Sequence, residues 1–180
     1  MDLLDFTGEE MYFDRPLPAE VDALITAAAE QYGTDAAEHS LMRAYFLAPD
    51  HLSVLVALYR FFYYRQRYAD ALVVADRAIA LACRELGLHA DWQRLSAEDL
   101  HAAAQQSMVL TRFLLLALKG AGFLLLRMER PAEALERLEK AAAIDDDDRL
   151  GLTDMLAWAR RAASRDAVES QGDNIHYIGR

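Results

Sequence analysis

The sequence has few of the residues that break helices and few signals for strands. Its 180 residues include four prolines and eight glycines, and no long stretch alternates apolar and polar side chains. Strands are therefore not expected. The apolar fraction of 54%, much of it alanine, is large enough for one domain with a sizeable core. The sequence predicts an all-α fold.

Cysteine is also scarce, because Cys83 stands alone. A single cysteine excludes an intrachain disulfide and a metal site built from several cysteines. Cys83 lies on a predicted helix face without an adjacent cationic partner in the sequence. This placement favours a buried, inert thiol over a nucleophile.

Basic residues are fewer than acidic ones: the chain has 19 Lys and Arg residues, 29 Asp and Glu residues and a net charge of −10. Surfaces that bind phosphates need clustered cations, so we expect neither nucleic acid nor an anionic membrane as a partner. The first ten residues lack a basic region followed by an apolar run, and we expect a cytoplasmic location without a secretory signal. The most apolar stretch, 108–126, carries Arg112, Lys119 and two glycines, which is typical of a buried helix.

Signatures of catalysis are missing as well. No histidine lies three or four residues from another histidine or from the cysteine, and neither an HExxH motif nor a Gly-rich phosphate loop occurs. The run of four aspartates at 145–148 lacks the spaced ligands and the glycine of a calcium loop, so we interpret it as a solvated turn. We expect no enzyme activity, no metal and no cofactor.

Small residues recur at a fixed period. The chain has Ala71, Ala75 and Ala78 in one helical segment, and a period of 34 residues places Ala37, Leu41 and Ala44 at the matching positions upstream. Further along, Ala134, Leu138 and Ala141 have the same internal spacing. Each group follows a helical segment whose mostly apolar residues have the same offsets. The chain therefore contains three related units, each made of two helices.

These units resemble the tetratricopeptide repeat (TPR), a 34-residue helix–turn–helix unit. The resemblance places the repeats at 18–51, 52–85 and 115–148, and it implies a right-handed α-α superhelix, a solenoid of antiparallel helix pairs. In the family, small side chains stand where two helices cross closely and large ones fill the remaining space. Some positions depart from the pattern: Cys83 and Asp146 stand where the family has proline.

The other segments surround this array. Residues 1–15 are predicted to form a non-helical N-terminal arm, 16–165 the TPR-like domain, and 166–180 a flexible tail. The domain includes an insertion at 86–114 and a capping helix at 150–165, which would cover the last apolar face. A helical pattern that continues from Ala97 to about Met128 predicts one long helix.

The resemblance also implies a binding groove, lined by the first helix of each repeat. At the corresponding positions of repeats 2 and 3 stand Ser53, Val56, Arg60, Tyr63, Tyr64, Leu116, Lys119, Phe123, Leu126 and Arg127. One family subtype clamps a C-terminal carboxylate with Lys, Asn and Arg residues. Here Asp22, Thr26, Ala57, Leu116 and Gly120 occupy those places, so we exclude that ligand.

The remaining aromatics and cations favour a partner peptide or helix with apolar anchors and an acidic residue. We therefore expect a non-catalytic scaffold or adaptor that binds a protein or peptide partner. The alternative is a dedicated cytoplasmic chaperone of a secretion substrate. A homodimer is also expected, because the stretch 108–126 is apolar on nearly every face.

The N-terminal arm combines aromatic and acidic residues in its first 15 positions. Two interpretations stay open from the sequence. The arm lies against the array as a stand-in for a partner peptide, or it is a simple cap or tail that leaves the groove open.

Overall fold

The computed structural model describes residues 15–172, and it describes the side chains of residues 15–168. Within this part of the chain the backbone forms α-helices, one short 3-10 helix and no strand. The elements are α1 (Ala19–Glu30), α2 (Asp35–Leu47), α3 (Leu52–Tyr64), α4 (Tyr68–Glu85), η1 (Trp92–Arg94), α5 (Ala97–Gln106), α6 (Met108–Arg127), α7 (Pro131–Ala142) and α8 (Thr153–Gly172). The predicted all-α class is confirmed for these residues.

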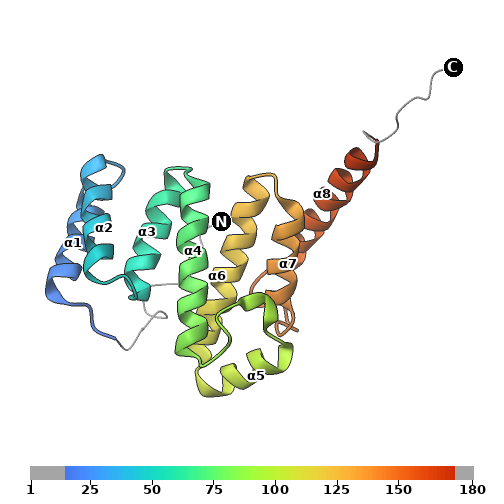
Figure 1. Cartoon of the computed structure of the whole chain (residues 1–180), viewed down its shortest axis with the longest axis horizontal. Helices are drawn as coiled ribbons and strands as arrows, with labels where there is room; N and C mark the ends of the chain where they lie inside the picture. The colour runs from blue at the N-terminus through green and yellow to red at the C-terminus, as the bar shows by residue number, and fades with distance from the viewer. Residues whose placement is uncertain (1–14, 173–180) are drawn as a thin grey trace.

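The long helices stand side by side in a row that begins with α1 and ends with α8 (Figure 1). The packing follows this order. The helices of each pair α1–α2, α3–α4 and α6–α7 contact each other, and α4 packs extensively on α6. Each element thus buries one face against its neighbours in the row.

The turns of two helix pairs have the same geometry. Between α3 and α4, Gln66 has a φ of 57° and the N–H of Arg67 donates to the carbonyl of Phe62. Between α6 and α7, Glu129 has a φ of 59° and the N–H of Arg130 donates to the carbonyl of Leu125. This is the Schellman arrangement that ends many helices, used here with non-glycine residues. Both turns lie five residues before an alanine of the periodic pattern.

The periodic alanines lie in the core, and Ala37, Ala71 and Ala134 have an exposed fraction of 0%. The packing between α6 and α7 is equally close at Gly122. A Cβ atom at this position would lie 2.8 Å from two side-chain carbons of Leu138. Small residues therefore stand where the helices approach each other most closely.

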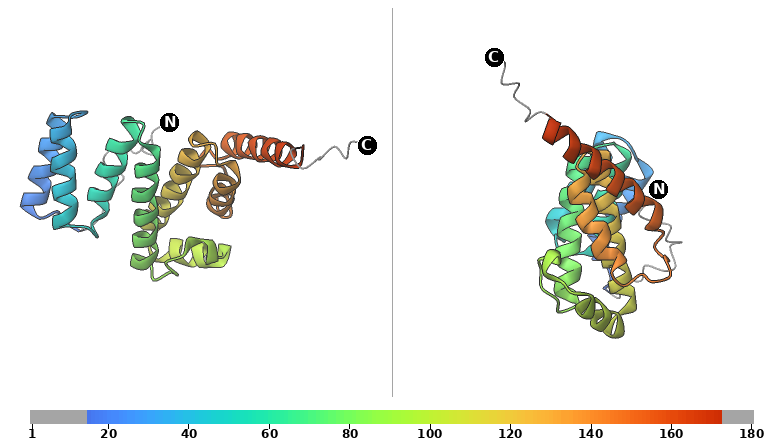
Figure 2. Two further views of the ribbon diagram at one scale, coloured as in Figure 1. Left: turned by 45° about the horizontal axis from the view of Figure 1, so that its top comes forward. Right: turned by 90° about the vertical axis from the view of Figure 1, so that its right-hand side faces the viewer.

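The prediction of one long helix from Ala97 to Met128 is wrong. Ser107 adopts an extended conformation, with φ −151° and ψ 99°, and separates α5 from α6. Its side chain accepts a hydrogen bond from the N–H of Leu110, so it caps the start of α6. A serine cap inside an otherwise helical pattern was the missed signal. The break lets α5 turn away from the axis of α6 and pack against that helix (Figure 2).

The last helix differs in its bounds from the predicted capping helix at 150–165. It begins at Thr153 and ends at Gly172, so residues 166–172 of the predicted tail are helical. Leu152, Met155 and Ala159 bury the face of this segment that packs on α7. The remainder of the tail, 173–180, and residues 1–14 of the arm lie outside the described residues.

Helix α6 is long and apolar enough to cross a membrane by composition alone. In the fold, however, 67% of its most apolar window is buried inside the protein, where α4 and α7 cover it. This environment is typical of a core helix. It also removes much of the apolar surface on which the expectation of a homodimer rested.

Candidate functional site

A partly open groove of about 630 Å³ lies between α1 and α3. Its volume is in the range of known ligand-binding clefts. The lining is mostly apolar, and it consists of Ile25, Ala28, Ala29, Tyr32, Leu41, Ser53, Val56, Ala57, Arg60 and Tyr64.

The sequence of α3 sets which side chains face the groove. Apolar residues cover almost every turn of this helix, and the largest of them, such as Leu55, Leu58 and Phe61, are buried in the core. Ser53, Val56, Arg60 and Tyr64 recur at spacings of three and four residues, which places them on one stripe. This stripe is half-buried or exposed and forms one wall of the groove.

Arg60 gives the groove its charge, since it is the one charged residue among the described residues that line it. The chain as a whole is acidic, with a net charge of −10. Arg60 is exposed to solvent, so water and salt weaken its attraction for a carboxylate. The site therefore combines apolar area with one exposed cation at its edge.

Aromatic rings close one end of the groove. The ring of Tyr32 meets those of Phe61 and Tyr64 edge to face, each with centroids 6.1 Å apart. The Tyr32 hydroxyl donates a hydrogen bond of 3.2 Å to the main-chain carbonyl of Arg60. Next to it, Arg65 donates to the carbonyl of Gly33 at 2.7 Å and ties α3 to the turn that follows α1.

Tyr32 was not among the predicted site residues, because it lies beyond the end of α1 and outside the repeat positions used to choose them. The sequence feature that could have identified Tyr32 as a groove residue is its position directly before the glycine of a turn. Gly33 has a φ of +85°, a conformation that glycine adopts readily, and the turn brings the tyrosine back onto α3.

The structure does not bring all ten predicted groove residues together. Ser53, Val56, Arg60 and Tyr64 line the groove between α1 and α3. A second group joins α3, α4 and α6. Here Tyr63 lies 6.1 Å from Phe123 between ring centroids, and Arg127 lies 5.5 Å above the ring of Tyr68.

The remaining predicted residues have packing roles. Leu126 is buried, and Leu116 is half-buried. The ammonium group of Lys119 donates to the main-chain carbonyl of Leu150 and pins the loop before α8 onto α6. These three side chains stabilise the fold and do not line the α1–α3 groove.

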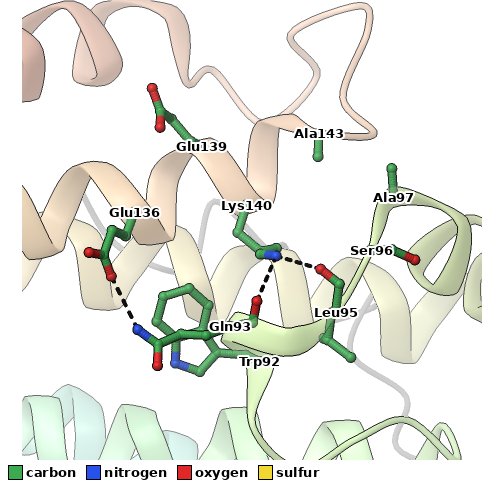
Figure 3. A pocket seen from close by; sticks show the side chains of 9 residues that line it. All are labelled: Trp92, Gln93, Leu95, Ser96, Ala97, Glu136, Glu139, Lys140 and Ala143. Atoms are coloured by element: carbon green, nitrogen blue, oxygen red, sulfur yellow. Dashed lines mark hydrogen bonds between the residues drawn. The ribbon is translucent and has the colours of Figure 1, made fainter.

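A second cavity, of about 480 Å³, lies between the η1 loop and α7 (Figure 3). Its polar groups satisfy one another. Lys140 donates to the main-chain carbonyls of Gln93, at 3.1 Å, and Leu95, and the Gln93 amide donates to Glu136 at 3.2 Å. These contacts attach the insertion to α7, so the cavity has a structural explanation.

A third cavity, of about 550 Å³, lies between α5, α6 and the aspartate run. Asp145 accepts hydrogen bonds from the N–H groups of Arg149 and Leu150, and Asp148 accepts from the N–H groups of Leu152 and Thr153. The aspartates therefore fold the loop that leads into α8. In the part of the chain that the structure describes, no group of His, Cys, Asp and Glu residues is arranged to hold a metal ion.

Cys83 is fully buried in the core. Burial, and next the negative charge of Asp91, raise the pKa of its thiol to about 11. A thiol with this pKa is protonated at neutral pH, so it is a poor nucleophile.

The chain is similar to an uncharacterized 19.8 kDa protein in the nifW 5′ region of Azotobacter chroococcum mcd 1. The two sequences are 46% identical over 160 residues, which cover 87% of this chain and 89% of the relative. No family model matches the chain. No solved structure matches it either.

Proposed function

We propose that this chain, which belongs to the same family as the 19.8 kDa protein of Azotobacter chroococcum, is a non-catalytic protein-interaction module of the TPR type. It binds a partner peptide or helix in the groove between α1 and α3. The observation that carries the proposal is the groove itself. It is mostly apolar, it has one cation at Arg60, and the helices that form it are the first helices of two predicted repeats.

The helix pairs support the TPR assignment. The predicted repeats 18–51 and 52–85 each contain one pair, α1–α2 and α3–α4, with the repeat boundary in the turn between α2 and α3. The matching turns at Gln66 and Glu129 are separated by 63 residues, the same distance that separates Ala71 from Ala134. The same offset between turn and alanine in both pairs supports two copies of one helix–turn–helix unit, separated by the insertion.

A TPR array curves into a superhelix whose concave face carries the first helix of each repeat. Under this proposal α1, α3 and α6 line that face, and the α1–α3 groove is its first section. The partner then presents apolar or aromatic side chains to Ile25 and Val56 and an acidic group to Arg60. Tyr32 and Tyr64 offer rigid aromatic surface at the end of the groove.

The relative's printed name locates its gene in the 5′ region of nifW. The nifW product is therefore the first protein to test as a partner. Helix α6, which is long and apolar enough to cross a membrane, is mostly buried among the described residues, and this burial is consistent with the cytoplasmic location that we propose.

Affinity capture with matched variants tests the proposal. Val56→Glu puts an acidic side chain in the groove one helical turn before Arg60, where it removes apolar area and repels an acidic partner, whereas Val73→Glu makes the same change on α4 at a side chain that is 70% exposed. Circular dichroism checks that both variants are folded. A protein captured by the wild type and by Val73→Glu, and lost with Val56→Glu, supports the groove as the binding site. Equal capture by both variants contradicts it. A folded partner indicates a scaffold, and an unstable client held in equal amount indicates a chaperone.

A further inference from the structure

The chain enters the described fold at a fixed point beside the start of α3. Nδ1 of His51 accepts from the N–H of Ser53 at 3.3 Å, so Nε2 carries the ring proton and donates to the carbonyl of Arg15 at 3.2 Å. The guanidinium of Arg15 donates to the carbonyl of Asp50 at 3.2 Å and lies 3.9 Å from Glu85. His51 is buried, and Arg15 is therefore held at the α2–α3 turn.

The same turn is one end of the groove. Ser53, the second residue of α3, lines the groove at this end, and Arg60 and Tyr64 line it further along the helix. A chain that leads into Arg15 along the groove runs antiparallel to α3. It passes Tyr64 first, then Arg60 and Val56, and reaches Ser53 last.

The preceding segment is long enough to follow this path. Fourteen residues precede Arg15, and an extended chain of that length spans up to about 45–50 Å. Helix α3 has 13 residues and is about 20 Å long. The segment is therefore long enough to span the whole groove.

The composition of the segment is complementary to the groove. Residues 1–14 contain acidic residues and no Lys or Arg, and they carry the acids Asp2, Asp5, Glu9, Glu10 and Asp14. Between these acids stand leucine, methionine and three aromatic side chains, Phe6, Tyr12 and Phe13. The groove offers the reverse, a cation in an apolar and aromatic lining.

We propose that residues 1–14 bind in the groove of their own chain, antiparallel to α3, with a carboxylate of the segment paired to Arg60. The segment then occupies the site of the partner peptide, and a partner must displace it. This inference rests on the proposed function in using the same groove. The free protein is then blocked by its own segment, and its apparent affinity for a partner equals the intrinsic affinity multiplied by the fraction of time that the groove is free.

Hydrogen exchange followed by mass spectrometry tests the proposal on the full chain. In the wild type, the amides of residues 2–14 are expected to exchange at least about tenfold more slowly than those of a synthetic peptide of the same sequence. Arg60→Glu is expected to return them to the rate of the peptide. The hydrogen bond from Tyr32 goes to the main chain of Arg60, so this substitution leaves it in place. Arg161→Glu, the same charge change on an exposed residue of α8, is expected to leave the protection intact.

A triple variant in the segment itself, Asp5→Asn with Glu9→Gln and Glu10→Gln, keeps the test valid if Arg60→Glu does not fold. It is expected to raise exchange in residues 2–14 and leave α3 unchanged. Exchange at the peptide's rate in the wild type overturns the inference. Protection that survives both variants, or that falls when the protein is diluted tenfold, also overturns it, because the segment then binds elsewhere or on a second copy. The capture test with Val56→Glu examines the proposed function independently of this inference. If the segment does not bind the groove, that test still shows whether a partner does.

Discussion

Arg137 on α7 donates to both carboxylate oxygens of Asp76 on α4, with N–O distances of 2.5 and 3.4 Å. The guanidinium also lies 5.0 Å above the ring of Trp92 in the insertion. One nearly buried cation thus joins three elements, α4, η1 and α7.

Asp76→Asn leaves the charge of Arg137 without its carboxylate. An unpaired buried charge destabilises a fold strongly, and the partial exposure of Asp76 reduces the effect to about 1–3 kcal/mol of unfolding free energy. Urea unfolding measures this loss. Asp147→Asn is the matched control, because the Asp147–Arg149 pair is exposed and is expected to change stability by less than about 0.5 kcal/mol. Equal effects in the two variants would show that Arg137 does not depend on Asp76.

Ala71→Leu is expected to overpack the α3–α4 interface and to cost about 1–3 kcal/mol of unfolding free energy. Ala71 is completely buried, so the added carbons displace neighbouring side chains. Ala102→Leu makes the same change on the exposed face of α5 and is expected to be tolerated. The adjacent Ala103 is buried and does not serve as a control. Thermal melts compare the variants, and a neutral Ala71→Leu would contradict close packing at this position.

Asp148 gives a pH dependence with a definite sign. Hydrogen bonds from Thr153 and then from the N–H of Leu152 lower the pKa of Asp148 below its ordinary value of 3.8. A carboxylate with a depressed pKa stabilises the fold above that ordinary value, and this contribution is lost as the pH falls through the folded-state pKa. Asp148→Asn retains a side chain that tolerates the residue's φ of 51° but removes the titration.

The variant is expected to be less stable than the wild type at neutral pH, and the difference between the two is expected to shrink as the pH falls from about 5 to about 2. Chemical unfolding at several pH values measures it. Asp146→Asn, on the same exposed loop, is the control and is expected to follow the wild type. A constant difference across the range would show that Asp148 is not a titrating cap.

Cys83 is expected to resist thiol reagents while the protein is folded. At pH 8 the raised pKa lowers the thiolate fraction, and burial restricts access, so the unfolded chain in urea should react at least about a hundredfold faster. A colorimetric thiol reagent measures both rates. Val73→Cys adds an exposed thiol to the same protein and should react rapidly without denaturant. Rapid reaction of Cys83 in the native state would contradict its burial.

The sequence predicts much of the helical framework, because the spacing of apolar and small residues indicates which helix faces are buried. The alanines at 37, 71 and 134 lie in the core for the reason the pattern indicates. It does not predict the break at Ser107, because residues on both sides favour helix and only the capping side chain separates them. The sequence-based prediction also starts the flexible tail too early, at residue 166, whereas α8 continues to Gly172.

The candidate site is less predictable than the framework. Repeat positions select Ser53, Val56, Arg60 and Tyr64, and the structure places all four on one wall of the α1–α3 groove because one helical stripe carries them. They also select Lys119, which does not line this groove. Its ammonium group donates to the main-chain carbonyl of Leu150, which lies in a loop 31 residues further along the chain. Tyr32 is missed for a similar reason. Its position depends on the turn at Gly33, which no helical period describes.

Site-specific photo-crosslinking tests the central claim most directly. A photoreactive amino acid at position 56 lies in the groove, and one at position 73 lies on an exposed part of α4. After irradiation in cells, we expect an adduct with a partner protein from position 56 and none from position 73. An adduct from position 73 alone, or equal adducts from both, would contradict the assignment of the α1–α3 groove as the binding site.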